Sequence, residues 1–232
     1  MTPVDVSVPF LFVNPKSYLY GRESLELARA ADRISEQYGL TIFYTCPYAD
    51  LRLIAGETRH IVVTAQNMDA LSPGHGMGAV LPESLAEAGA RAVVLNHAEC
   101  PKTLAQLTAC VRRAHALGLL SIVCADSAEE AGAAAVLGAD VVLAEPTRLI
   151  GTGTAAGVDY IQESVRAVRR AAPHVKVMIA SGITVPMDAY RVVFSGADGT
   201  GSTSGIVKAP DPPLRLEEMA KAVLQAARDR NN

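Results

Sequence analysis

Residues 92–145 read AVVLNHAECPKTLAQLTACVRRAHALGLLSIVCADSAEEAGAAAVLGADVVLAE, and they alternate apolar runs with amphipathic segments. The apolar runs lie at 92–97, 120–125 and 140–145 and are rich in Val, Ile and Leu. Uninterrupted apolar runs are typical of strands in a parallel sheet, because both faces of that sheet are covered. The segments between them, 103–118 and 127–138, place apolar residues at helical spacing and end on glycine. The stretch therefore predicts strand–helix repeats.

The same alternation continues on both sides of this stretch. Further apolar runs occur at 10–14, 41–46, 61–65, 175–180 and, in weaker form, 198–204. The eight runs start 20 to 35 residues apart, which is the length of a strand–helix–strand crossover. We therefore expect an α/β protein in which residues 1–232 form a single-domain closed (β/α)8 barrel. A doubly wound open sheet remains an alternative, because it shows a similar alternation.

The eighth run, DGTGSTS at 198–204, contains no Val, Ile or Leu. Residues of this kind are depleted in strands or contribute little to packing on a sheet. We therefore expect this strand to pack weakly and to leave a wider, more polar mouth on the barrel.

The composition excludes several classes of protein. The chain has 232 residues, 50% of them hydrophobic, with four cysteines and a formal net charge of −3, which indicates a globular protein. Lys and Arg nowhere form a run of three, so we expect neither nucleic acid nor a membrane surface as partner. The start of the chain lacks the layout of a signal peptide, and we expect a cytoplasmic protein. We interpret the four cysteines as reduced and mostly buried thiols.

Polar residues follow several of the predicted strands. The carboxyl ends of barrel strands meet at one rim, where barrel enzymes carry their active sites. The candidate rim residues are Asn14, Lys16, Gln66, Asn67, His97, Glu99 and Glu145. A carboxylate can remove a proton from carbon, a neutral imidazole can donate to a carbonyl oxygen, and a lysine can stabilise the resulting negative charge. These residue types indicate proton transfer on a small compound, without a metal or an organic cofactor.

Glycine-rich segments follow the sixth, seventh and eighth strands. The segment PTRLIGTGTAAG at 146–157 has the composition of a hinged lid. It lacks the spacing of a dinucleotide-binding fingerprint. The turns SGIT at 181–184 and TSGI at 203–206 consist mainly of small residues, so their backbone N–H groups can approach an anion closely. Loops in these positions of a barrel often bind phosphate, which favours a phosphorylated substrate.

Five segments resemble the triosephosphate isomerase family, in particular its short, archaeal-type branch. They are NPK (14–16), AQN (65–67), LPESLAEAGA (81–90), LNHAE (95–99) and AEPTRLIGTG (144–153). They lie in the family's order over nearly the whole chain. The resemblance implies a cofactor-independent aldose–ketose isomerase of glycolysis and gluconeogenesis that interconverts dihydroxyacetone phosphate and glyceraldehyde 3-phosphate.

The resemblance also implies roles for individual residues. Glu145 would be the base, His97 a neutral electrophile at the start of a helix, and Lys16 the cation for the phosphate and the enediolate. Asn14 and Glu99 would support them, and residues 146–154 would form the lid. The substrate-binding residues would be Asn14, Lys16, Ile150, Gly151, Gly182, Ser204 and Gly205. The resemblance further implies a homodimer or homotetramer, in which the loop around Met77 reaches the neighbouring site.

Three positions besides the eighth strand depart from the family pattern. Pro15 fills the middle of N-x-K, Ala98 replaces a serine between His97 and Glu99, and Met77 stands where a threonine is usual. These departures leave other functions open: isomerisation of a related phosphorylated sugar such as a tetrulose phosphate, or a non-catalytic phosphate-binding barrel. A lyase or aldolase that uses Lys16 as a Schiff-base nucleophile is a third alternative.

Overall fold

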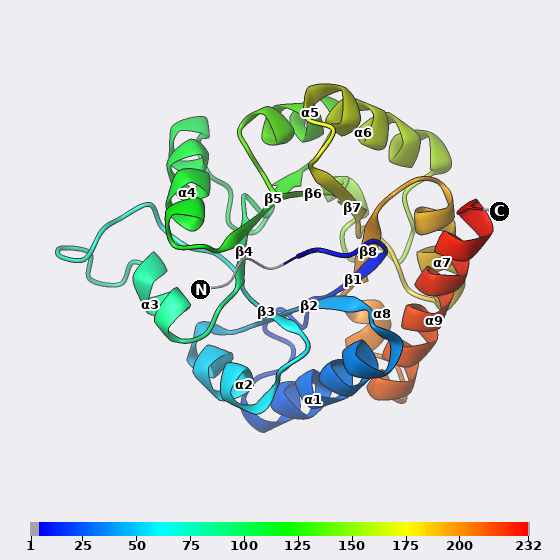
Figure 1. Ribbon diagram of the computed structural model, residues 1–232, viewed down its shortest axis with the longest axis horizontal. Coiled ribbons are helices and arrows are strands. Elements are labelled where there is room, and N and C mark those ends of the chain that lie inside the picture. Colours follow the sequence, from blue (N-terminus) through cyan, green and yellow to red (C-terminus); the bar gives the residue numbers. More distant parts are fainter. Residues whose placement is uncertain (1–4, 232) are drawn as a thin grey trace.

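The computed structural model describes residues 5–231 and contains a closed barrel of eight parallel strands in chain order (Figure 1). The strands are β1 (Phe10–Val13), β2 (Thr41–Cys46), β3 (Val62–Ala65), β4 (Ala92–Leu95), β5 (Leu120–Ala125), β6 (Val141–Ala144), β7 (Lys176–Ile179) and β8 (Gly199–Ser202). Closure is made by β8, which pairs in parallel with β1, with Phe10 opposite Gly199 and Phe12 opposite Gly201. The predicted barrel is confirmed, and the open sheet is excluded.

Helices surround the barrel. They are α1 (Gly21–Tyr38), α2 (Leu51–Glu57), α3 (Pro82–Glu87), α4 (Leu104–Ala116), α5 (Ala128–Val136), α6 (Val158–Ala171), α7 (Pro186–Phe194), α8 (Ser204–Val207) and α9 (Pro212–Asn231), with 3-10 turns at Tyr48–Asp50 and Thr147–Leu149. Local signals set several of these boundaries. Helix α4 begins after a capping box in which Thr103 and Gln106 satisfy each other's backbone N–H groups, and α1 ends at Gly39 in the left-handed conformation.

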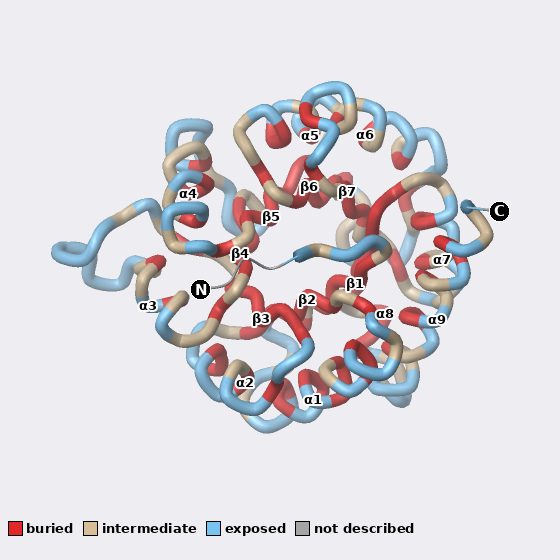
Figure 2. The backbone as a smooth tube through the Cα atoms, viewed as in Figure 1, coloured by how far each residue is buried: buried red, intermediate tan, exposed pale blue. Residues whose placement is uncertain are grey.

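Two apolar clusters hold the fold together, and Figure 2 shows the buried residues on the strands and on the inner faces of the helices. The larger cluster lies between the strands and the helices. The smaller cluster fills the inside of the barrel with alternate residues of the strands, including Phe10, Phe12, Phe43, Ile122, Leu143 and Met178. Side chains therefore fill the barrel below the rim, and any ligand must bind at its mouth.

The eighth strand packs tightly, so the expectation of a weakly packed strand is wrong. A Cβ atom on Gly199 would lie 2.5 Å from ring atoms of Phe10, and one on Gly201 would lie 2.8 Å from Cβ of Phe12. The two glycines thus leave the space that the two phenylalanine side chains occupy. The remaining polar side chains of β8 are buried and bonded: the Thr200 hydroxyl donates to the Ile179 carbonyl, at 2.7 Å.

The cysteines fit the sequence interpretation of free, mostly buried thiols. All four are free thiols, and Cys46, Cys110 and Cys124 are buried, whereas Cys100 is exposed. Within the described residues, no helix has the length and apolarity needed to span a membrane.

Candidate active site

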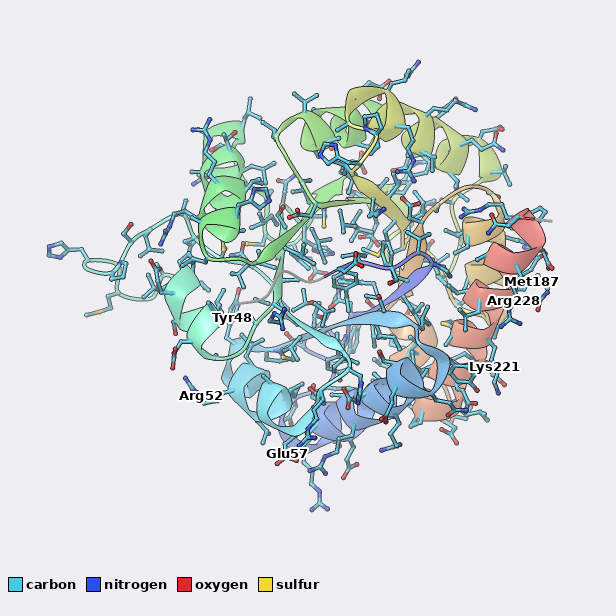
Figure 3. The ribbon with its side chains drawn as sticks, in the orientation of Figure 1. Tyr48, Arg52, Glu57, Met187, Lys221 and Arg228 are labelled. Atoms are coloured by element: carbon cyan, nitrogen blue, oxygen red, sulfur yellow. The ribbon has the colours of Figure 1, made fainter. Side chains whose placement is uncertain are left out.

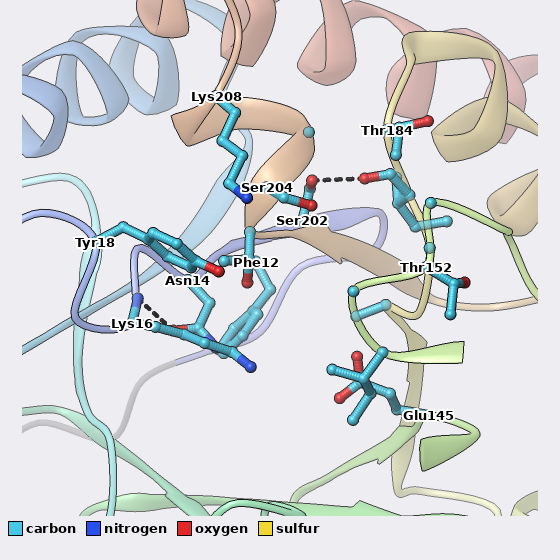
Figure 4. A pocket seen from close by; sticks show the side chains of 18 of the residues that line it. Phe12, Asn14, Lys16, Tyr18, Glu145, Thr152, Thr184, Ser202, Ser204 and Lys208 are labelled. Atoms are coloured by element: carbon cyan, nitrogen blue, oxygen red, sulfur yellow. Dashed lines mark hydrogen bonds between the residues drawn. The ribbon is translucent and has the colours of Figure 1, made fainter. Parts of the chain in front are cut away.

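The mouth of the barrel carries a cavity of about 740 Å³ at the carboxyl ends of the strands (Figure 4). Every residue that the sequence analysis placed in the catalytic, supporting or substrate-binding set lines it: Asn14, Lys16, His97, Glu99, Glu145, Ile150, Gly151, Gly182, Ser204 and Gly205. Loops after β1, β4, β6, β7 and β8 supply these residues. The barrel thus gathers residues from positions 14 to 205 around one cavity. Gln66 and Asn67 instead line a smaller neighbouring cavity, which Lys16, His97 and Glu99 also border.

Lys16 is presented by a tight turn directly after β1. The Tyr18 N–H donates to the Pro15 carbonyl at 2.9 Å, and Lys16 takes a left-handed φ of 49°. Its N–H donates to Oδ1 of Asn14 at 3.1 Å, and the Thr45 hydroxyl donates to the same oxygen at 2.6 Å. Pro15 is compatible with this turn because only its carbonyl is needed. Asn14 therefore supports the backbone that carries Lys16.

The Lys16 ammonium forms an ion pair with Glu99, with 2.8 Å between Nζ and Oε1. This contact lowers the pKa of the Glu99 carboxyl, chiefly through the hydrogen bond from Lys16. The ion pair joins the loops after β1 and β4 across the rim. Glu99, rather than Glu145, is thus the carboxylate paired with Lys16 in this structure.

His97 is held in a defined neutral form. The Glu99 backbone N–H donates to Nδ1 of His97 at 3.1 Å, so Nδ1 must be unprotonated and the ring proton resides on Nε2. Burial lowers the pKa of the imidazole, and the positive charge of Lys16 lowers it further. Nε2 lies 3.7 Å from Oε2 of Glu145, and these side chains are only 12% and 14% exposed.

The helix start at His97 that the family resemblance implies is wrong, whereas the helical segment predicted at 103–118 is confirmed as α4. The Cys100 N–H donates to the His97 carbonyl at 2.8 Å and forms a turn, and α4 begins only at Leu104. The capping box at Thr103 sets that later start. A turn N–H, burial and Lys16 therefore keep the imidazole neutral where a helix terminus was expected to do so.

Glu145 follows β6, and its backbone N–H donates to the Ala125 carbonyl at 2.8 Å. Burial raises the pKa of its carboxyl above the ordinary value, although the Lys16 charge acts in the opposite direction. A raised pKa makes a carboxylate a stronger base in water-poor surroundings. Ala98 and Glu145 both border a second cavity of about 410 Å³, so no hydroxyl at position 98 restrains the carboxylate there.

At the end of the cavity formed by the segments after β7 and β8, main-chain atoms of neighbouring segments lie close together. A Cβ atom on Gly182 would lie 1.9 Å from the Thr154 carbonyl oxygen, and one on Gly205 would lie 2.5 Å from that of Ile183. The Ser202 hydroxyl donates to the Ile183 carbonyl at 2.7 Å and joins the end of β8 to the loop after β7. Only glycine fits at positions 182 and 205, and the resulting small-residue cradle suits a phosphate group.

The sequence analysis missed several residues that line the same cavity. They include Tyr18, Ser202, Lys208 and Arg215, while Thr152 and Thr184 belong to the predicted lid and to the predicted SGIT turn. Arg215 donates from Nη1 to the carbonyls of Thr184 and Gly205, at 2.7 and 3.4 Å, and so ties the two loops of the cradle together. Lys208 follows the TSGI turn closely in the sequence, which is a signal that points to it. Arg215 lies in α9, and no local pattern distinguishes it from other surface arginines.

Within residues 5–231, no three His, Cys, Asp or Glu side chains are grouped so that they could hold a metal ion. The rim groups described above include the Glu145 carboxylate, the neutral His97 imidazole and the Lys16 ammonium paired with Glu99. Such a set can move protons between neighbouring carbon and oxygen atoms of a small molecule.

Comparisons with known proteins agree with this site. A family model described as triosephosphate isomerase matches residues 9–220. The triosephosphate isomerase of Methanopyrus kandleri is 39% identical over 218 residues, covering 91% of this chain and 96% of the relative. That of Methanosarcina barkeri is 35% identical over 223 residues, with 94% and 100% covered. That of Methanocaldococcus jannaschii is 34% identical over 218 residues, with 92% and 99% covered. This chain therefore belongs to the triosephosphate isomerase family, as its sequence motifs predict.

Proposed function

We propose that the protein interconverts dihydroxyacetone phosphate and glyceraldehyde 3-phosphate by proton transfer through an enediolate. The observation that carries this proposal is the pairing of a neutral His97, protonated on Nε2, with a largely buried Glu145 carboxylate 3.7 Å away, in a cavity that Lys16 also lines. These are the groups that moving a proton between adjacent carbons requires.

In the proposed reaction, Glu145 removes a proton from C1 of the ketose and returns it to C2. His97 donates its Nε2 proton to the carbonyl oxygen as negative charge develops there, and it recovers a proton from the neighbouring hydroxyl. Lys16 stabilises the enediolate, while Glu99 and Asn14 position Lys16. The net change moves hydrogen within the substrate, so the step needs no cofactor.

The phosphate would bind at the cradle formed by Ile150, Gly151, Gly182, Ser204 and Gly205. Gly182 and Gly205 support this assignment, because both line the cavity and carry no side chain that would cover their main-chain N–H groups. Residues 146–154 would close over the bound substrate and exclude water, which protects an enediolate from side reactions.

Turnover of the two triose phosphates by the purified protein tests the proposal, alongside the Glu145→Gln variant. The variant keeps the size of the side chain and removes its basicity, so we expect activity to fall at least about 10²-fold. Glu163→Gln, on the outer helix α6, is the matched control and should retain full activity. Equal activity in the wild type and in Glu145→Gln would refute the assignment of the base.

The alternatives separate in the same assay. The alternative of a tetrulose phosphate substrate rested in part on a weakly packed eighth strand, and the tight packing of β8 weakens that argument. A non-catalytic barrel is disfavoured by the convergence of His97 and Glu145. Turnover of a four-carbon ketose phosphate, with none of the trioses, would nevertheless replace the proposed substrate. Trapping of Lys16 by borohydride with substrate would indicate the lyase or aldolase instead.

We also propose that the protein is a homodimer or homotetramer that works in the cytoplasm. The loop between β3 and α3 projects from the barrel (Figure 1), and Met77 within it is fully exposed. The loop is held at its base, where Asp69 and Val80 exchange backbone and side-chain hydrogen bonds of 3.0 and 2.8 Å. A smaller cavity of about 210 Å³, beside Lys16 and Glu99, is the surface on which a partner's loop would fit.

Sedimentation of the wild type and of Met77→Asp tests the assembly. We expect the variant to dissociate and to lose activity, because the charge would be buried against the partner. Met187→Asp, at another exposed methionine on α7, is the control. A fully active monomer would overturn this part of the proposal.

A further inference from the structure

Three cations line the main cavity, and two of them are already paired with carboxylates. Lys16 contacts Glu99 at 2.8 Å, and Arg215 contacts Glu218 at 3.3 Å. Lys208 is exposed, and the residues that the structure describes give it no ion pair. Its positive charge is therefore the one at this cavity that no carboxylate compensates.

Lys208 is fixed close to the proposed phosphate cradle. It follows α8, and its backbone N–H donates to the Ser204 carbonyl at 3.1 Å. The Cα atom of Lys208 thus lies one helical turn from Ser204 and Gly205. Figure 4 shows the side chain extending from that helix toward the part of the cavity where Ser204 lies.

The Lys208 side chain rests on an aromatic ring. Its Nζ lies 5.1 Å from the centroid of the Tyr18 ring, within the range of a cation–π contact. Tyr18 belongs to the same 15–18 turn that presents Lys16. An aromatic face restricts a flexible lysine without neutralising its charge, whereas a carboxylate would compete with an anionic ligand. The Lys208 ammonium is therefore positioned by the ring and remains free to bind an anionic ligand.

We propose that Lys208 is a second cation for the phosphate dianion of the substrate and that Tyr18 is its positioning residue. This inference rests on the proposed function, because it assigns the same cradle to a phosphate. The ammonium would donate a charge-assisted hydrogen bond to a phosphate oxygen, on the side of the anion that faces the mouth. Lys208 would then act on substrate binding, while Lys16 also acts on the enediolate.

Binding of inorganic phosphate and steady-state kinetics of Lys208→Gln test the proposal. We expect phosphate to bind about fivefold to tenfold more weakly and KM to rise by a similar factor, because one charge-assisted hydrogen bond is lost. The value of kcat should stay within about twofold, since Lys208 does not reach the reacting carbons. The difference between variant and wild type should shrink at high salt, which screens exposed charges.

Lys221→Gln is the matched control. Lys221 lies on α9, outside the cavity (Figure 3), and its Nζ also lies over a tyrosine ring, 6.0 Å from the centroid of Tyr38. Unlike Lys208, Lys221 also forms an ion pair with Glu217, with 2.8 Å between Nζ and Oε1. Its loss removes the same formal charge and the same kind of ring contact. We expect unchanged phosphate binding and kinetics, so an effect of Lys208→Gln cannot come from net charge alone.

Two variants at position 18 test the positioning role. Tyr18→Leu should raise KM in the same direction as Lys208→Gln but by less, with kcat unchanged. Tyr18→Phe keeps the aromatic face, so its KM should equal that of the wild type. In a Lys208→Gln background, Tyr18→Leu should have no further effect on phosphate binding, because its role passes through the ammonium.

Phosphate affinity that is the same in Lys208→Gln and in the wild type would overturn the inference. The result is separable from the test of the reaction. A wild type that turns over no triose phosphate, but loses phosphate binding on Lys208→Gln, would refute the proposed reaction and support the role of Lys208. Full turnover of the triose phosphates by the wild type, with unchanged phosphate binding in Lys208→Gln, would support the proposed reaction and refute the role of Lys208.

Discussion

A single methyl group added at Gly199 tests how the barrel interior is packed. An ideal Cβ atom there would lie 2.5 Å from Cδ2 and Cε2 of Phe10 and 2.7 Å from its carbonyl oxygen. Phe10 is fully buried and packs edge-on against Phe43, with 5.5 Å between the ring centroids. The ring therefore has no free space to move into, and Gly199→Ala should strain the centre of the barrel.

The expected magnitude follows from which atoms collide. Overpacking of this kind costs about 1–3 kcal/mol in the free energy of unfolding. Phe10→Ala should cost about 3–5 kcal/mol, because it leaves a cavity where the ring stood. In the double variant the ring collision is gone and the new methyl group occupies part of that cavity. Gly199→Ala should then cost about 1–2 kcal/mol less than in the wild type, which is the coupling energy of the pair.

Urea unfolding followed by far-ultraviolet circular dichroism measures all four states of this cycle, since the chain has no Trp to serve as a fluorescent probe. Gly56→Ala, in helix α2, is the control: a Cβ atom there has nothing within 4 Å. We expect it to stabilise the protein slightly and to show no coupling with Phe10→Ala. Additivity of Gly199→Ala and Phe10→Ala within about 0.5 kcal/mol would refute the packing argument.

Three further predictions concern the cavity. His97→Gln should lower kcat by about 10²–10³-fold with little change in KM, since it removes a donor to the developing oxyanion. A rise in KM with kcat unchanged would contradict this role. Because the pKa of Glu145 is raised, the acid limb of kcat/KM against pH should lie above the ordinary glutamate value of 4.5, with activity lost as pH falls and the base is protonated. A limb at or below that value would show that burial does not govern this carboxyl. Gly182→Ala should lower kcat/KM by about tenfold or more, because its Cβ would displace the Thr154 carbonyl, whereas Gly157→Ala, where a Cβ meets nothing within 4 Å, should leave kcat/KM unchanged.

The alternation of apolar runs and helical segments predicts the barrel because both signals are local. A strand buried on two faces must be apolar throughout, and a covering helix must be amphipathic. The site residues could also be predicted from the sequence, since each follows a strand and the carboxyl ends of parallel strands meet at one rim. The start of α4 could be predicted too, because Thr103 and Gln106 have the spacing of a capping box.

Two features depended on contacts between distant parts of the chain. The packing of β8 cannot be inferred from its own residues, because its partner is β1, about 190 residues earlier, whose Phe10 and Phe12 fill the space above the glycines. A propensity scale averages over neighbours and misses such a complementary pair. Likewise, Tyr18 and Lys208 meet only because β1 and β8 close the barrel.

The sequence by itself determined the barrel, its strand order and the identity of the rim residues, since these follow from periodicity and from short motifs. Only the tertiary structure decided the surroundings of those residues: the backbone N–H that fixes the proton of His97 on Nε2, the largely buried Glu145, Lys16 paired with Glu99, and an uncompensated Lys208. The physical reason is that protonation and charge compensation depend on burial and on distances of a few ångströms between groups far apart in the chain.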